Sequence, residues 1–331
     1  MEFRPLADQV VLLTGATSGI GLATARLHAE RGARLILVAR GAGDCEALAA
    51  ERPHAVAAPA DVADRDALRA AAEKGLDRWG RIDTWINDAG VAIYGTVERV
   101  PIEDQRRLFE TNYWGALHGM LEALRLHREG RGVAKIVTVG SQLSDRAMIF
   151  QGPYSASKHA IKAVTDALRM ETQREGLDLS ITLVKPGSID TPYMEHARDH
   201  LGATGTVNPP RAYAPEVVAR GIAWACENHI RDLDVGGAGW LTAKAGRIAP
   251  ELTDLGMALL GRLLQTSDRR PRPGMRDNLE TSARGGETRS NQPGPPARPV
   301  SLMMEAQMHP AATAAIAAGV LVGAAMLARR R

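Results

Sequence analysis

The feature that most constrains this chain is an alternation of two hydrophobic patterns between Gln9 and about Gly237. Short runs that are apolar throughout are separated by amphipathic stretches of helical length. Strands of this kind, with helices between them, belong to parallel sheets buried on both faces. The pattern predicts a single doubly wound α/β domain over residues 1–250, with right-handed crossovers. The seven runs are QVVLLTG, ARLILVAR, HAVAAPADV, IDTWINDAG, AKIVTVGS, LSITLVKPG and LDVGG.

The composition agrees with a globular protein that has an ordinary core. Hydrophobic residues make up 45% of the 331 residues and charged residues 24%. A net charge of +3 is too small to indicate nucleic-acid binding. Cys45 and Cys226 lie far apart and match no metal-ligand spacing, so we expect free thiols and no metal site. The N-terminal residues lack the apolar stretch of a secretory signal, which favours a cytoplasmic protein.

A glycine-rich turn follows the first apolar run. The eight residues from Thr14 to Gly21 read TGATSGIG and precede the first helical pattern. Between a strand and a helix, glycines let the backbone approach a diphosphate, and the first N–H groups of the helix face the phosphates. The turn therefore predicts a dinucleotide site.

Six further motifs follow in order along the chain. They are ADV at 60–62, NDAG at 87–90, ETNYWG around Asn112, VTVGS ending at Ser141, YSASK at 154–158 and PGSIDTP after the sixth run. With the spacing T-G-x-x-x-G-x-G, the set resembles the short-chain dehydrogenase/reductase family over residues 8–240. Asp88 departs from the family pattern N-N-A-G, where the second position is asparagine. The resemblance implies a Rossmann-like fold and an NAD(P)-dependent oxidoreductase that transfers a hydride between the cofactor and a carbonyl or alcohol.

The same resemblance implies which residues hold the cofactor. Asp61 matches the aspartate that contacts the adenine ring, and the PGSIDTP loop matches the segment that closes over the nicotinamide. The expected cofactor-binding residues are Gly15, Ser18, Gly19, Ile20, Gly21, Arg40, Asp61, Val62, Asn87, Ala89, Gly90, Tyr154, Lys158, Pro186, Gly187, Ile189 and Thr191.

Tyr154 and Lys158 are four residues apart, so a helix places them on one face. An ammonium beside a phenol stabilises the phenolate, which allows Tyr154 to exchange a proton with a carbonyl or alcohol oxygen. Ser141 is expected to hydrogen-bond the same oxygen. The resemblance implies that Lys158 also binds the nicotinamide ribose and that Asn112 holds a water, which completes a catalytic tetrad.

The end of the second apolar run bears on the choice of cofactor. NAD sites place a carboxylate there, whereas NADP sites place an arginine against the 2′-phosphate. Arg40 holds this position, and the nearest carboxylate is Asp44 in the following loop. NADP(H) is therefore favoured over NAD(H), and with it the reduction of a carbonyl compound.

The substrate is less constrained than the cofactor. Apolar residues in two loops favour an apolar ketone or aldehyde, although ordinary packing would also explain them. An alternative function is a non-catalytic dinucleotide-binding scaffold or sensor with the same fold, which the complete tetrad disfavours. We also expect a homo-oligomer. The apolar residues are Met148, Ile149, Phe150, Tyr193 and Met194.

The C-terminal part changes character after residue 250. Leucines at helical spacing predict an amphipathic helix over 251–265. Residues 266–309, rich in Pro, Gly and Arg, are expected to form a disordered linker. Residues 310–331 predict an apolar tail helix that is a candidate membrane anchor at the cytoplasmic face. Its uncharged run holds nine alanines and has marginal length for a span, so a soluble alanine-rich helix is the alternative.

Overall fold

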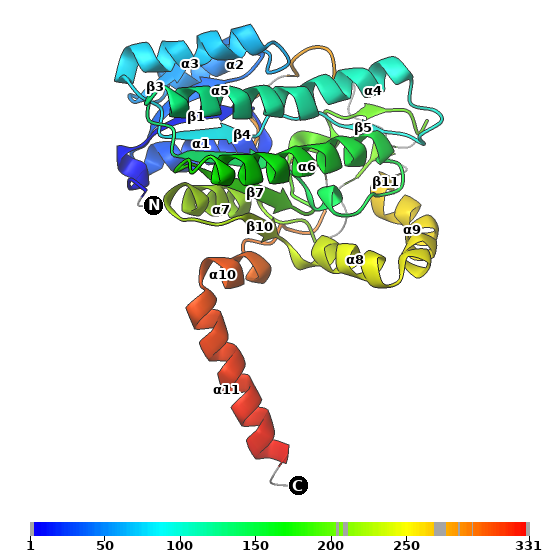
Figure 1. Cartoon of the computed structure of the whole chain (residues 1–331). Helices are drawn as coiled ribbons and strands as arrows, with labels where there is room; N and C mark the ends of the chain where they lie inside the picture. Colours follow the sequence, from blue (N-terminus) through cyan, green and yellow to red (C-terminus); the bar gives the residue numbers. More distant parts are fainter. Residues whose placement is uncertain are drawn as a thin grey trace.

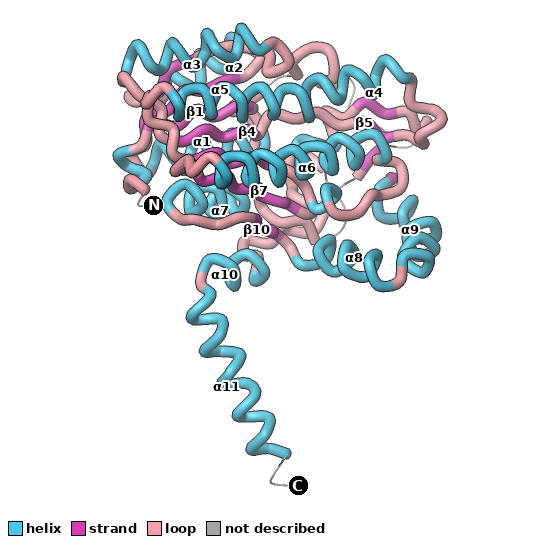
Figure 2. Tube along the Cα trace, in the orientation of Figure 1, coloured by secondary structure: helices cyan, strands magenta, loops and turns pink. Residues whose placement is uncertain are grey.

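A computed structural model of the chain describes residues 3–202, 205–207, 211–267, 276–283, 285–292 and 294–328. Its centre is a seven-stranded sheet with the order β10-β7-β6-β4-β1-β2-β3, and every neighbouring pair is parallel. Figure 2 shows these strands between two layers of helices. The expected doubly wound α/β fold is confirmed. The strands are β1 Val10–Thr14, β2 Arg34–Val38, β3 Ala55–Ala57, β4 Thr84–Asn87, β6 Lys135–Val139, β7 Ser180–Pro186 and β10 Asp232–Val235.

Helices connect these strands and cover both faces of the sheet (Figure 1). Four short strands pair outside the main sheet, β5 with β8 and β9 with β11. The helices are α1 Gly19–Glu30, α2 Ala42–Ala50, α3 Arg65–Trp79, α4 Ile102–Phe109, α5 Ala116–Arg128, α6 Gly152–Arg174, α7 Pro215–Glu227, α8 Gly237–Ile248 and α9 Pro250–Gln265. The short strands are β5 Ile93–Tyr94, β8 Arg198–Asp199, β9 Gly205–Thr206 and β11 Thr266–Ser267.

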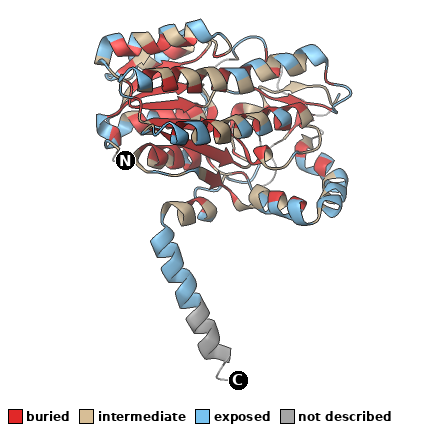
Figure 3. Ribbon diagram, viewed as in Figure 1, coloured by how far each residue is buried: buried red, intermediate tan, exposed pale blue. Residues whose placement is uncertain are grey.

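The strands are apolar throughout because they contribute side chains to two hydrophobic cores, one on each face of the sheet. In β1, Val11 and Leu13 face a cluster that includes residues of α1, α2 and α7. Val10 and Leu12 face a second cluster formed with α3, α5 and α6. Successive side chains of a strand point to opposite faces, so both faces of this strand need apolar residues. Figure 3 shows the resulting buried centre.

The strand order reverses between β1 and β4. From β1 the chain proceeds outward to β2 and β3, and it then returns to the other side of β1 at β4. In open parallel sheets, ligands bind outside the carboxyl ends of the strands at such a reversal. The glycine-rich turn after β1 and the NDAG turn after β4 both lie there.

The helical stretch between β5 and β6 is interrupted by a π-helical turn. The turn spans Glu110–Gly115, between α4 and α5. Single π turns occur often at functional sites because they change the direction in which side chains point. Here the turn contains Asn112.

The segment 266–309 corrects an expectation from the sequence. Its described parts pack on the domain, whereas the composition predicted a disordered linker. Leu279 and Met304 are fully buried, and Leu302–Met308 form helix α10. One apolar side chain at each of these places anchors an otherwise polar stretch. We call residues 276–283 and 285–292 the strap.

The tail forms helix α11, Pro310–Ala328, which extends away from the body of the molecule (Figure 1). In the described part of the chain, no helix is both long and apolar enough to cross a membrane. The membrane anchor suggested for residues 310–331 is not supported by this finding. The terminal residues 329–331 lie outside the described residues.

Candidate active site

Two adjoining cavities lie at the carboxyl ends of the strands. The larger has a volume of about 710 Å³ and the smaller about 80 Å³. Both are lined by parts of the glycine-rich turn and of the NDAG turn. The predicted residues that line the larger cavity are Gly15, Ser18, Gly19, Ile20, Ala89, Gly90, Ser141, Tyr154, Lys158, Pro186, Gly187, Ile189 and Thr191, and the smaller cavity adds Arg40, Asp61 and Val62.

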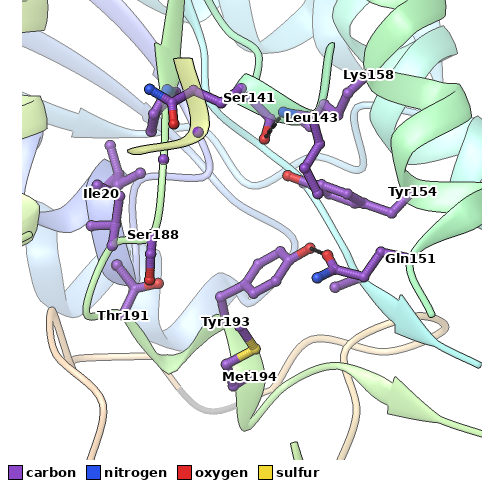
Figure 4. Close-up of a pocket in the computed structure, with 18 of the residues that line it drawn as sticks. Ile20, Ser141, Leu143, Gln151, Tyr154, Lys158, Ser188, Thr191, Tyr193 and Met194 are labelled. Carbon is purple, nitrogen blue, oxygen red and sulfur yellow. Dashed lines mark hydrogen bonds between the residues drawn. The ribbon is translucent and has the colours of Figure 1, made fainter. Parts of the chain in front are cut away.

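Tyr154 and Lys158 lie in the first turns of α6, and both are buried. The Lys158 Nζ is 5.6 Å from the centre of the Tyr154 ring, and it donates a hydrogen bond of 3.0 Å to the Val139 carbonyl at the end of β6. The helix thus fixes the spacing between Tyr154 and Lys158, and the Val139 carbonyl fixes the position of the Lys158 ammonium. Figure 4 shows Tyr154 pointing into the cavity.

Ser141 follows β6 and begins a short helical turn, Gln142–Ser144. Its Oγ accepts the N–H of Leu143 at 3.0 Å. This contact uses an acceptor site of the oxygen and leaves the hydroxyl hydrogen free to donate. Ser141 and Tyr154 line the same cavity, as Figure 4 shows, so their hydroxyl groups can reach one substrate oxygen.

Asn112 lies beside the cavity and not in its wall. Its Oδ1 accepts the N–H of Val91 at 2.8 Å, and its Nδ2 donates to the Val91 carbonyl at 3.0 Å and to Ser157 Oγ at 3.2 Å. Both amide hydrogens are therefore committed to protein atoms. In this arrangement Asn112 fixes the backbone next to Gly90, close to Lys158.

The glycine-rich turn has no room for side chains at two of its glycines. Gly15 has a φ of +71°, and a Cβ there would lie 2.8 Å from the backbone nitrogen of Ala89. A Cβ on Gly21 would lie 2.1 Å from the Gly15 carbonyl oxygen. Thr14 Oγ1 joins this turn to the NDAG turn by accepting the N–H groups of Asp88 and Ala89. The result is a cradle of bare backbone at a helix N-terminus, which fits a dinucleotide diphosphate.

Asn87, expected to contact the cofactor, lies instead within the sheet and lines neither cavity. Its Nδ2 donates to Thr138 Oγ1 at 3.2 Å, and its Oδ1 accepts Trp85 Nε1–H at 2.9 Å. The next residue, Asp88, lines the larger cavity in its place. Burial raises the pKa of Asp88 to about 7, against the opposing effects of Lys158 and the Gly21 N–H.

Arg40 lies at the expected place after β2, but the strap binds its guanidinium. That group donates to the carbonyl oxygens of Asn278, Leu279 and Glu280. Asp61, which also lines the small cavity, is paired with Arg107 at 2.7 Å. The strap thus forms an outer wall of this cavity, which explains its small volume.

The apolar end of the larger cavity includes three of the five apolar loop residues, namely Met148, Tyr193 and Met194. The other two are directed elsewhere. Ile149 packs against Gly261 of α9, and Phe150 occupies a turn with a φ of +64°.

The Tyr193 ring packs edge-on against Tyr154, with ring centroids 5.5 Å apart. Burial, reinforced by the neighbouring tyrosines, raises the pKa of Tyr193, so this phenol keeps its proton. The two tyrosines therefore differ in role, since only Tyr154 has an ammonium beside its ring.

Sequence reasoning missed several residues of the site. Gln142 joins the loop after β7 to the segment after β10, since its Nε2 donates to the Val235 carbonyl at 3.3 Å. Gly187 and Gly239 approach its side chain too closely to carry a Cβ. The glycines of LDVGGAG are the sequence feature that could have indicated a close approach of another side chain at this place. The strap gave no comparable signal, because its composition resembles that of a disordered segment.

Comparisons with known proteins give the family of this chain. Residues 9–202 match the family described as short chain dehydrogenase. The chain is 36% identical over 330 residues to "Uncharacterized oxidoreductase YxnA" of Bacillus subtilis (strain 168), covering 98% of this chain and 92% of that protein. It is 35% identical over 198 residues to "Dehydrogenase/reductase SDR family member 7B" of Bos taurus, covering 56% and 59% of the two chains.

Two solved structures share the fold. One is a short chain dehydrogenase/reductase from Burkholderia phymatum in complex with NAD, with a TM-score of 0.66 and 23% identity over 76% of this chain and 96% of that one. The other is an alcohol dehydrogenase from the archaeon Thermococcus sibiricus complexed with 5-hydroxy-NADP, with a TM-score of 0.59 and 23% identity over 69% and 95%. The chain belongs to the short-chain dehydrogenase family, and it is an oxidoreductase of that family that acts on CH–OH or C=O groups.

Proposed function

We propose that this protein reduces an apolar ketone or aldehyde with NADPH. The observation that carries the proposal is the convergence of Ser141, Tyr154 and Lys158 on one cavity of about 710 Å³, whose wall also includes the glycine-rich turn. The glycine-rich turn would hold the diphosphate of a dinucleotide, and Ser141 and Tyr154 line the same cavity.

The bound cofactor supplies the hydride to the carbonyl carbon. The protein handles the proton. Tyr154 donates its phenolic proton to the carbonyl oxygen, and the O–H of Ser141 donates a hydrogen bond to the same oxygen. The ammonium of Lys158 stabilises the phenolate that remains. The reverse sequence removes the proton from an alcohol.

Two observations support the finer parts of the proposal. Arg40 is a guanidinium at the end of β2, where a 2′-phosphate would find a charge-assisted partner, which favours NADPH. Met148, Tyr193, Met194, Met257 and Leu264 line the cavity beyond the tyrosine, which favours an apolar substrate.

The test is a panel of apolar ketones and aldehydes assayed by loss of NADPH absorbance, with NADH in parallel. We expect turnover of at least one compound, faster with NADPH. Tight dinucleotide binding without turnover of any compound would favour the non-catalytic scaffold instead. Faster turnover with NADH would overturn the cofactor assignment alone.

A further inference from the structure

The strap lies on the part of the site where a dinucleotide diphosphate would bind. Gly286 donates its N–H to the Thr17 carbonyl at 2.9 Å, and the N–H of Gly19 donates to the Glu287 carbonyl at 2.9 Å. Gly285 donates its N–H to Asp44 Oδ2 at 2.8 Å. Three consecutive strap residues thus bind the glycine-rich turn and the first turn of α2.

The contact with Gly19 uses a group that the cofactor needs. Gly19 is the first residue of α1, and its N–H is among those that have no partner within the helix. Such N–H groups bind phosphate at helix N-termini. The Glu287 carbonyl therefore occupies a position that a phosphate oxygen would take.

The strap also binds Arg40, which lies about 240 residues before its strap partners in the sequence. Its guanidinium donates to strap carbonyl oxygens, including those of Leu279 and Glu280 at 3.3 Å each. A 2′-phosphate would compete for these N–H groups with a charge that a carbonyl lacks.

The strap is held in place from its N-terminal end. Leu279 is fully buried in a cluster with residues of β5 and α4, and Asp277 pairs with Arg198 at 3.0 Å. The N–H of Asn278 donates to the His196 carbonyl at 3.0 Å.

The other end of the strap is held as well, since Arg289 pairs with Glu216 at 3.0 Å and the N–H of Asn291 donates to Glu195 Oε1 at 2.7 Å. The glycine-containing part between these ends can therefore leave the turn while the strap stays attached to the domain.

We propose that the strap closes the diphosphate-binding turn in the free protein and must release Gly19 and Thr17 before a dinucleotide binds. The inference rests on the proposed dinucleotide-dependent function. The observed dissociation constant then equals the intrinsic constant divided by the fraction of molecules with the strap open. Holding the strap closed weakens binding, and loosening it strengthens binding.

A disulfide can hold the strap closed. A Cβ on Gly41 would lie 3.6 Å from the Ser282 Cβ, which is within the range found in disulfides. Gly41 has a φ of −73°, so a cysteine fits its backbone. We expect the oxidised Gly41→Cys/Ser282→Cys variant to bind NADPH at least tenfold more weakly in a fluorescence titration, and a reductant to restore the affinity. The single variant Gly41→Cys, treated identically, is the control.

A second variant loosens the strap. A Cβ on Gly285 would lie 2.8 Å from the Thr17 carbonyl oxygen, whereas a Cβ on Gly294 would meet open space. We expect Gly285→Ala to lower the dissociation constant for NADPH about threefold or more and to speed association, with Gly294→Ala unchanged. These readouts measure binding alone and are independent of turnover.

The outcomes separate this inference from the proposed function. Equal NADPH affinity of the oxidised and reduced double variant, with the disulfide verified by mass spectrometry, would overturn the strap mechanism and leave the function intact. Unchanged or weaker binding by Gly285→Ala would contradict it too. If the unmodified protein binds no dinucleotide, both proposals fail.

Discussion

The two ends of the cofactor groove are built differently. The catalytic end is formed by strand ends and the start of α6, and it borders an open cavity of about 710 Å³. The other end, beside Arg40 and Asp61, is closed to about 80 Å³ by a segment from the far end of the chain. The side chains of the first end are held by regular elements in the free protein, whereas access to the second depends on where the strap lies.

This difference separates two kinds of control. The positions of Ser141, Tyr154 and Lys158 follow from burial and from regular elements, so they change only if the domain is disrupted. The contacts of Gly19 and Arg40 with the strap are individual hydrogen bonds to a segment that is remote in sequence. Such bonds each contribute about 1 kcal/mol, so that end can open without loss of the fold.

The largest expected effect concerns the catalytic end. Tyr154→Phe should lower kcat at least 100-fold with the preferred ketone, because a positioned proton donor contributes about 10²–10⁴-fold. Tyr113→Phe is the matched control, since this ring packs on Phe109 and Trp114 and lines neither cavity, and it should stay within about threefold of the unmodified rate. NADPH affinity of both variants is measured in parallel. A Tyr154→Phe variant with more than a tenth of the original kcat would refute the assignment.

The next effect tests the cradle that both ends share. Gly21→Ala places a Cβ 2.1 Å from a backbone oxygen, so we expect at least a tenfold loss of NADPH affinity together with a lower Tm. Gly43→Ala, inside α2 and with open space around its Cβ, should raise stability by up to about 1 kcal/mol. Titration and thermal unfolding of the two variants give the comparison. Normal affinity of the Gly21→Ala variant would show that the turn is not the diphosphate site.

Arg40→Ala tests the strap-covered end. Loss of a charge-assisted contact should weaken NADPH binding about tenfold more than NADH binding. Because the change also removes the strap contacts of Arg40, NADH binding should be unchanged or slightly stronger. The ratio of the two dissociation constants is the quantity to measure. An unaltered ratio would remove Arg40 from cofactor selection.

The smallest effect concerns the pH dependence of stability. Because the pKa of Asp88 is about 7 in the folded protein and 3.8 ordinarily, the folded state retains a proton that the unfolded chain releases. The free energy of unfolding therefore falls as the pH rises from about 4 to about 7. A shift of this size amounts to roughly 4 kcal/mol for an enclosed carboxyl, and we expect less at this open cavity. Asp88→Asn should show a smaller loss between about pH 5 and pH 8 in urea unfolding. An equal fall in the free energy of unfolding for Asp88→Asn and the unmodified protein would show that the pKa of Asp88 is not raised.

Sequence reasoning predicted the parts of the molecule that repeat a simple physical pattern. All seven strands of the main sheet were predicted, because a strand buried on both faces must be apolar throughout. The motif residues Ser141, Tyr154 and Lys158 meet at one cavity as predicted. The side chain of Asn87 bonds Trp85 and Thr138 within the sheet, which could not be predicted because a motif does not show which side of a strand end its residues face.

The strap was not predictable for a different reason. It contributes one fully buried side chain, Leu279, and its other contacts to the turn come from the backbone. Backbone hydrogen bonds leave no pattern of residue types. A composition rich in Pro, Gly and Arg is therefore equally typical of a disordered segment and of an irregular segment that packs on a domain.

The π turn at Glu110–Gly115 has a consequence for chain length in this region. Leu108 before the turn and Met120 after it face different buried clusters, while Asn112 within the turn reaches Val91. Each helical residue advances the side-chain direction by about 100°. Deletion of a single residue here would rotate all later positions of α5 relative to α4. Natural variation in this helix should therefore proceed by substitution, and insertions or deletions should fall in the loops on either side.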